Sequence, residues 1–126
     1  MQVLSVRVVR HTRHFDKMMR FYRDVLEMRS ISSWKRPDSE GALLSPGKAM
    51  GQMVIEILDH KGHTTGRSKP ANVDLSLEVR DVAAWHDRLR KQGIAIVDKL
   101  SDKPWGHRAF TVEDPDGMRV TIYQAI

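Results

Sequence analysis

Residues 73–79 are Val-Asp-Leu-Ser-Leu-Glu-Val, a strict alternation of apolar and polar side chains. Such alternation is typical of a strand that buries one face and turns the other toward solvent or a cavity. Asp81 follows as a natural helix N-cap, and Val82, Trp85 and Leu89 then form one apolar stripe at helical spacing. This stretch therefore predicts a strand followed directly by an amphipathic helix.

The same strand-then-helix pattern stands 67 positions earlier in the chain. Residues 3–9 are rich in β-branched side chains, Thr12 is the expected helix N-cap, and the apolar stripe from Phe15 maps onto the stripe from Val82. After each helix the patterns predict three strands, at 29–35, 41–45 and 52–58 in the first half and at 94–97, 108–112 and 118–124 in the second. Two copies of a βαβββ unit indicate a tandem repeat.

We therefore predict an α+β fold in a single domain, residues 1–126. Module one covers about residues 1–58 and module two about residues 72–126. The segment between them, about residues 59–71, is polar and without periodicity, so it is expected to be a linker.

The composition narrows the classes of protein that remain. The chain has 126 residues, 40% of them hydrophobic and 29% charged, which suits a globular domain with its own core. No apolar run approaches the roughly 18 residues of a membrane span, and the N-terminus does not resemble a signal peptide. We expect a cytoplasmic protein with no membrane partner. Because the chain has no cysteine, disulfides, thiolate metal sites and cysteine nucleophiles are excluded.

The net charge of +5 is unevenly distributed, since residues 1–36 alone carry nine basic and three acidic side chains. A nucleic-acid-binding protein is one alternative, and it predicts strongly salt-dependent retention on DNA. However, there is no dense basic run, and aromatic residues make up only 6% of the chain, too few for an obvious base-stacking platform. We therefore expect no nucleic-acid partner.

Three motifs resemble one known family. Residues 110–117 (Phe-Thr-Val-Glu-Asp-Pro-Asp-Gly) are similar to its closing hairpin, residues 21–28 to the end of its first helix, and residues 104–110 (Pro-Trp-Gly-His-Arg-Ala-Phe) to a segment of its small members. This family is the vicinal oxygen chelate superfamily, which includes glyoxalase I, bleomycin-resistance proteins, fosfomycin-resistance enzymes and extradiol dioxygenases. Glu27 stands where the family usually has glycine. The resemblance covers nearly the whole chain.

The resemblance implies two tandem βαβββ modules forming a cupped, partly open barrel, in proteins that are commonly homodimers. In the metal-dependent members, four side chains from the first and last strands of the modules bind the metal. Those positions fall on Arg7, Glu56, Asp74 and Thr121 here. A guanidinium cannot ligate a metal and a threonine hydroxyl is a poor ligand for a transition metal, which leaves Glu56 and Asp74 as the plausible ligands. We therefore expect no metal cofactor.

Two functions remain as alternatives, and neither has an identified catalytic residue. The first is a glyoxalase/bleomycin-resistance/dioxygenase-like protein that binds a small polar or aromatic molecule in its concave sheet without the usual metal centre. The second is a metal-dependent enzyme with a rearranged ligand set, such as a glyoxalase-like lyase, an isomerase or a dioxygenase. The metal content of the purified protein distinguishes them.

Strand alternation selects the candidate ligand-binding residues. Asp74 and Ser76 lie opposite the apolar face of their strand, and the same reasoning puts Arg7 and Glu56 on the cavity side of module one. Thr121 and Tyr123 complete this set in module two. Either Arg7 forms ion pairs with the carboxylates, or it binds an anionic group of the ligand through its two-pronged guanidinium.

An aromatic and basic cluster precedes the seventh strand. Trp105 offers a ring for stacking on a planar ligand, and His107 offers an acid or a base. Alternation allows only one of His107 and Arg108 to face the cavity. His60 and His63 fall in the segment expected to be an exposed linker. Two histidines without a third ligand do not indicate a metal site, so neither is taken as a metal ligand.

Overall fold

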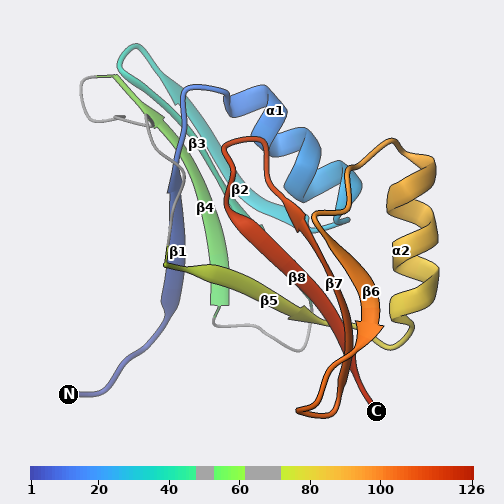
Figure 1. Cartoon of the computed structure of the whole chain (residues 1–126). Helices are drawn as coiled ribbons and strands as arrows, with labels where there is room; N and C mark the ends of the chain where they lie inside the picture. Colours follow the sequence, from blue (N-terminus) through green and yellow to red (C-terminus); the bar gives the residue numbers. More distant parts are fainter. Residues whose placement is uncertain (48–52, 62–71) are drawn as a thin grey trace. The chain divides into compact units, whose positions relative to one another are not determined.

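The computed structural model describes residues 1–47, 53–61 and 72–126. The chain forms two compact units, Met1–Ser68 and Lys69–Ile126 (Figure 1). Each unit contains a strand, a helical segment and three further strands, so the predicted α+β class and the tandem βαβββ organisation are confirmed. Whether the two units act as one domain remains a prediction.

The sheet of unit 1 contains β1 (Val6–His11), β2 (Arg29–Arg36), β3 (Ser39–Ser45) and β4 (Met53–His60). Its strand order is β1-β4-β3-β2, with β1 parallel to β4 and the other neighbours antiparallel. β4 includes Asp59 and His60, so the assignment of these two residues to the linker was wrong. His63 lies outside the described residues.

The helical segment of unit 1 differs from the single amphipathic helix expected. It consists of α1 (Phe15–Met19) and a six-residue π-helix, η1 (Arg20–Val25), and its predicted apolar stripe is mostly buried. Thr12 is not the N-cap, because the helix begins after His14. Instead the buried Thr12 Oγ1 accepts a hydrogen bond from the His14 N–H at 2.8 Å, which stabilises the turn that enters the helix.

Unit 2 repeats this arrangement with β5 (Asp74–Glu78), α2 (Val82–Lys91), β6 (Asp98–Asp102), β7 (His107–Glu113) and β8 (Arg119–Ala125). Its strand order is β5-β8-β7-β6, with β5 parallel to β8, which is the order of unit 1. The helices of the two units begin at Phe15 and Val82, at the predicted offset. Matching strand order and helix offset confirm the repeat.

The start of α2 is capped as the sequence predicts. The Asp81 carboxylate accepts a hydrogen bond from the Ala84 N–H at 3.1 Å, which satisfies one of the amides left unpaired in the first helical turn. A second such amide, that of Val82, donates to the side-chain oxygen of Gln124 on β8 at 3.1 Å. The helix start is thus tied both to its own cap and to the sheet.

The end of α2 explains why the strand predicted at 94–97 is wrong. The Gly93 N–H donates to the Arg90 carbonyl and the Ile94 N–H to the Leu89 carbonyl, each at 3.0 Å. These two bonds, with Gly93 at φ +79°, form a Schellman motif, in which the residue after the glycine packs back on the last turn. Ile94 therefore ends the helix, and β6 begins only after the apolar run.

Both hairpins of unit 2 turn on a Pro-x-Gly sequence. In the β6–β7 turn the Lys103 N–H donates to the His107 carbonyl at 2.6 Å, and the Gly106 N–H donates to the Lys103 carbonyl at 3.1 Å. The β7–β8 turn repeats both bonds over residues 114–118. Gly106 and Gly117 have φ values of +87° and +90°, a left-handed conformation that favours glycine. The turn that carries Trp105 is therefore a defined structure.

The sheet of unit 2 has one apolar and one polar face, as the alternation in β5 predicts. Figure 1 shows α2 beside this sheet. The apolar face of the sheet is buried, and its buried strand residues are Leu75, Phe110, Val112, Val120 and Ile122. The opposite face carries the polar members of β5, β7 and β8. Among the described residues, no helix is long and apolar enough to cross a membrane.

Candidate functional site

A pocket of about 430 Å³ lies on the polar face of the unit 2 sheet. This volume is in the range of small-molecule sites in proteins. All four strands of the sheet and the β6–β7 turn contribute to its lining, which consists of Asp74, Ser76, Asp98, Lys103, Trp105, His107, Ala109, Thr111, Arg119, Thr121 and Tyr123.

The structure brings six of the eight predicted ligand-binding residues together in this pocket. They are Asp74, Ser76, Trp105, His107, Thr121 and Tyr123. The other two, Arg7 and Glu56, belong to unit 1. The alternation within β5 and β8 identified Asp74, Ser76, Thr121 and Tyr123 as residues that share this face.

The aromatic end of the pocket is formed by His107 on β7 and Tyr123 on β8. Their rings are stacked, with centroids 4.1 Å apart and planes inclined by 14°. Trp105, in the turn beside them, is 68% exposed. Ala109 lies between His107 and Thr111 on the pocket face of β7. Its side chain is only a methyl group, so it leaves space in the pocket next to the stacked rings.

A row of polar side chains crosses the sheet next to this aromatic end. Each of the four strands contributes one residue to this row, and each residue is the cross-strand partner of the next: Ser76, Thr121, Thr111 and Asp98. The hydroxyls of Thr111 and Thr121 are hydrogen-bonded at 2.9 Å. A hydroxyl both donates and accepts, so this row can bind polar substituents of either kind.

The charged groups of the pocket are paired with one another. The Lys103 ammonium lies 3.2 Å from the Asp98 carboxylate and 2.8 Å from the Ser101 hydroxyl, and its side chain is only 16% exposed. Asp74 and Arg119 are cross-strand partners whose closest charged atoms are 3.9 Å apart. The second pair is looser, and both of its side chains are about half exposed.

His107 faces the pocket and its neighbour Arg108 does not. The Arg108 guanidinium donates two hydrogen bonds to the Asp102 carboxylate, at 2.6 and 3.3 Å. These bonds lower the pKa of Asp102 and raise the pKa of Arg108. Arg108 therefore has a structural partner on β6, and His107 is the member of this pair available to a ligand.

The metal-ligand positions of the family are engaged in contacts of their own. Arg7 Nη1 lies 3.1 Å from the inner carboxylate of Glu56, which is 13% exposed. Thr121 is bonded to Thr111, and Asp74 lies beside Arg119. In residues 1–47, 53–61 and 72–126, no three His, Asp or Glu side chains are grouped so as to hold a metal ion. A guanidinium and a paired hydroxyl at two of four positions do not fit a transition metal.

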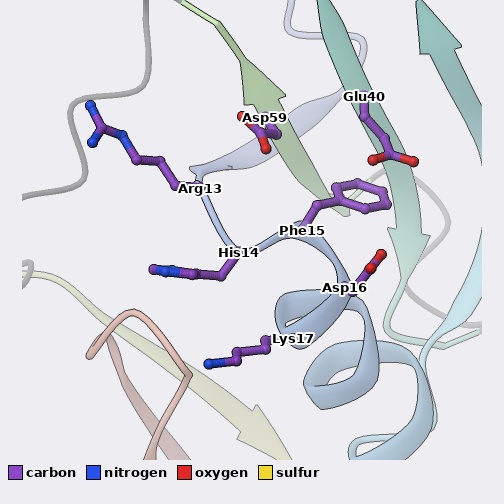
Figure 2. Close-up of a pocket in the computed structure, with 7 residues that line it drawn as sticks. All are labelled: Arg13, His14, Phe15, Asp16, Lys17, Glu40 and Asp59. Carbon is purple, nitrogen blue, oxygen red and sulfur yellow. The ribbon is translucent and has the colours of Figure 1, made fainter.

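A second pocket, of about 330 Å³, lies in unit 1 where α1 begins (Figure 2). Figure 2 shows the basic side chains Arg13, His14 and Lys17 extending to one side and the ring of Phe15 toward the strands. The acidic members are Asp16, Glu40 and Asp59, of which the last two are direct cross-strand partners on β3 and β4. This pocket was not predicted from the sequence, and its residue Asp59 was placed beyond the strand that in the structure contains it.

The sequence analysis missed five residues of the unit 2 pocket. Asp98 was missed because β6 was predicted four residues too early, and Lys103 because it lies beyond that strand. Ala109, Thr111 and Arg119 were detectable, since each is two or four positions from a predicted pocket residue on its own strand. Extending the alternation along β7 and β8 would have included these three.

Comparisons with known proteins agree with this architecture. The model of the Glyoxalase/Bleomycin resistance protein/Dioxygenase superfamily matches residues 5–122. The uncharacterized protein YycE of Bacillus subtilis (strain 168) is 25% identical over an alignment of 125 residues, and the match covers 96% of this chain and 88% of that protein. The crystal structure of the B. subtilis YycE protein has a TM-score of 0.74 and covers 94% of this chain and 88% of its own.

Two further solved structures are similar in fold. Glyoxalase I of Leishmania major, which is trypanothione-dependent, has a TM-score of 0.77 at 21% identity and covers 98% of this chain and 87% of its own. TnmS3, an antibiotic binding protein from Streptomyces sp. CB03234, has a TM-score of 0.74 at 22% identity and covers 100% and 97%. Because the family model matches nearly the whole chain, this protein belongs to the Glyoxalase/Bleomycin resistance protein/Dioxygenase superfamily.

Proposed function

We propose that this protein binds a small, ring-containing molecule with polar substituents in the pocket of unit 2. The observation that carries the proposal is the division of that pocket into an aromatic end and a polar end. The stacked His107 and Tyr123 supply a flat aromatic surface, and the row from Ser76 to Asp98 supplies donors and acceptors. Small-molecule sites commonly combine these two elements.

We further propose that binding proceeds without a tightly held transition metal. The support is the chemistry of the four family positions, where Arg7 is paired with Glu56 and Thr121 with Thr111. Protein purified without chelators is expected to contain no stoichiometric Ni, Zn, Mn or Fe by elemental analysis. Stoichiometric metal that is lost in the Glu56→Gln or Asp74→Asn variant would instead favour the alternative, a metal-dependent lyase, isomerase or dioxygenase.

We propose a homodimer as the assembly, on the resemblance to a family whose members are commonly dimers. Light scattering after size-exclusion chromatography checks this, since the chain has a mass of 14.5 kDa and a dimer has twice that mass. A mass of one chain at micromolar concentration would contradict it.

The binding proposal is tested with a set of soluble one- and two-ring compounds by ¹H–¹⁵N NMR. We expect chemical-shift changes concentrated at the amides of β7, β8 and the Trp105 turn. The Tyr123→Leu variant, which removes the stacked ring, is expected to weaken binding at least fivefold. The matched control is Arg108→Gln, whose side chain lies away from the pocket, and its affinity should equal that of the unaltered protein.

The outcome that contradicts the proposal is equally specific. If the bound compounds perturb only residues outside the pocket lining, or if Tyr123→Leu and Arg108→Gln bind equally well, the unit 2 pocket is not the binding site.

A further inference from the structure

The charges on the pocket face of unit 2 are not balanced. The charged side chains at pocket-facing positions of β5, β7 and β8 are Asp74, Glu78, Glu113 and Arg119. On the remaining strand and turn, Asp98 and Lys103 compensate each other. The face as a whole thus carries two more carboxylates than Lys and Arg side chains, and the surplus comes from Glu78 and Glu113 beside the pocket, because the lining itself has two acidic and two basic side chains. This surplus is local, because residues 69–126 as a whole have nine basic and nine acidic side chains.

Both cations of the face have carboxylates of the chain beside them. Arg119 on β8 is the direct cross-strand partner of Asp74 on β5 and of Glu113 on β7, so it has an acidic residue on either side. The Lys103 ammonium donates hydrogen bonds to Asp98 and Ser101, and the Lys103 side chain is mostly buried. An anionic ligand would have to compete with these carboxylates for either cation, and it would approach a negative surface.

Asp74 retains the capacity to bind a further cation, because it shares Arg119 with Glu113. Its side chain is 52% exposed, and its carboxylate lies 3.9 Å from Arg119 Nε, which exceeds hydrogen-bonding distance. Its oxygens can therefore accept further N–H groups, and hydrogen bonds between an ammonium and a carboxylate are among the stronger ones in proteins.

The aromatic end and the acidic end lie along one strand. The pocket face of β8 carries every second residue of the strand, namely Tyr123, Thr121 and Arg119. A strand rises about 3.3 Å per residue. The Thr121 row is therefore about 7 Å along the strand from Tyr123, and Asp74, which is opposite Arg119, is about 13 Å from it. A ring that packs between Tyr123 and the Thr121 row directs a short amino-alkyl tail across the hydroxyls toward Asp74.

Resting on the proposed binding function, we propose that this pocket selects aromatic amines, with the ring at His107 and Tyr123 and the ammonium at Asp74, over aromatic acids. From the sequence, an anionic group bound by Arg7 was one of two alternatives, the other being ion pairs between Arg7 and the carboxylates. In the structure Arg7 is paired with Glu56 in unit 1, and the pocket face of unit 2 carries the surplus of carboxylates.

Three probes that share one ring system test the selection. Tryptamine is cationic at pH 7, tryptophol is neutral and indole-3-acetate is anionic, and each is titrated into the ¹⁵N-labelled protein at low salt. We expect tryptamine to bind at least tenfold more tightly than indole-3-acetate, with tryptophol between them. Raising the salt to 0.5 M should narrow the difference, since screening weakens interactions between exposed charges.

Variants assign the effect to the named carboxylate. Asp74→Asn should weaken tryptamine binding about tenfold and leave tryptophol binding unchanged. Asp102→Asn makes the same chemical change on the other side of the sheet and should alter neither. If Asp74→Asn fails to fold by circular dichroism, Glu113→Gln removes one surplus charge of the face and should reduce the preference for tryptamine.

The outcomes separate the two proposals. Binding of indole-3-acetate as tight as that of tryptamine would overturn the charge selection and leave the binding proposal standing. If all three probes fail to perturb β7 and β8 at millimolar concentration, while other ring compounds bind there, the selection is likewise wrong. If no ring compound binds there, both proposals are wrong.

Discussion

The imidazole of His107 lies flat against the phenol ring of Tyr123, with ring centroids 4.1 Å apart. The two residues are on adjacent antiparallel strands, and Tyr123 is directly opposite Ala109, two positions along β7 from His107. The contact is therefore a diagonal one between neighbouring strands, which long and aromatic side chains can reach.

This stack is expected to stabilise the fold as well as to form the pocket. In a double-mutant cycle of His107→Ala and Tyr123→Ala, the coupling in unfolding free energy should be roughly 0.5–1.5 kcal/mol, as for other aromatic pairs. Urea denaturation of the four proteins measures it. Tyr123→Phe keeps the ring and should retain the coupling, so additive effects of the two alanine changes would contradict the stacking interaction.

The space beside Gly41 predicts a second effect on stability. Gly41 on β3 is the cross-strand partner of Trp34 on β2, and a Cβ built on the glycine would fall on the Cζ2 atom of the indole. Gly41→Val must therefore displace the ring, which we expect to cost about 1–3 kcal/mol of unfolding free energy, as overpacking commonly does. Thermal denaturation and the emission maximum of tryptophan report it together.

The matched control for this change is the double variant Gly41→Val with Trp34→Ala. With the indole removed, the valine has room, and its effect on stability should be much smaller than in the presence of Trp34. An equal effect in both backgrounds would show that the ring is not the cause.

Glu27 is the non-glycine residue with a positive φ, +59°, among the described residues. The left-handed conformation costs an L-residue roughly 1–2 kcal/mol, while glycine adopts it freely but loses more chain entropy on folding. We therefore expect Glu27→Gly to raise the unfolding free energy by about 0.5–1 kcal/mol. Glu27→Ala removes the same side-chain contacts without relieving the backbone, so a gain of equal size there would refute the explanation.

The Asp102–Arg108 pair predicts a pH dependence on the other side of the sheet. The hydrogen bonds from Arg108 lower the pKa of Asp102 in the folded protein, so the carboxylate stabilises the fold at pH values above its unfolded pKa of about 4. This contribution is lost as the pH falls through the lowered value. Because the pair is solvent-exposed, the effect is small.

The difference in melting temperature between the unaltered protein and Asp102→Asn should therefore be largest at pH 6–7 and shrink as the pH is lowered toward 2. Measurements in 1 M NaCl should show a smaller difference at every pH. A difference that stays constant with pH would mean that Asp102 acts through something other than its charge.

Local sequence was sufficient to predict the repeat and most of the pocket face. Alternation in β5 identified Asp74 and Ser76, and the Asp81 cap located the start of α2. These features depend on neighbouring residues, so they are visible in the chain itself. The strand wrongly predicted at 94–97 and the omission of Asp98 have one cause. The apolar residues after Gly93 have the composition of a strand, but the hydrogen bond from the Ile94 N–H to the Leu89 carbonyl belongs to the end of α2.

Other features depend on residues that are distant in sequence. The partner of Arg7 is 49 positions away, and the acidic neighbours of Arg119 come from two different strands. The sequence supplies these charges but not their pairing. For that reason the sign of the pocket's charge could be inferred only when the strand register was known.

The parallel pairing of each unit's first strand with its last also bears on how the chain folds during synthesis. β1 has β4 as its neighbour in the sheet, so Val6 must wait for Met53 to leave the ribosome before it acquires a hydrogen-bonded partner. Contacts between such distant residues form slowly, because a long loop must close first. The nascent first half is therefore expected to begin with the local β2–β3 hairpin and to recruit its N-terminal strand last.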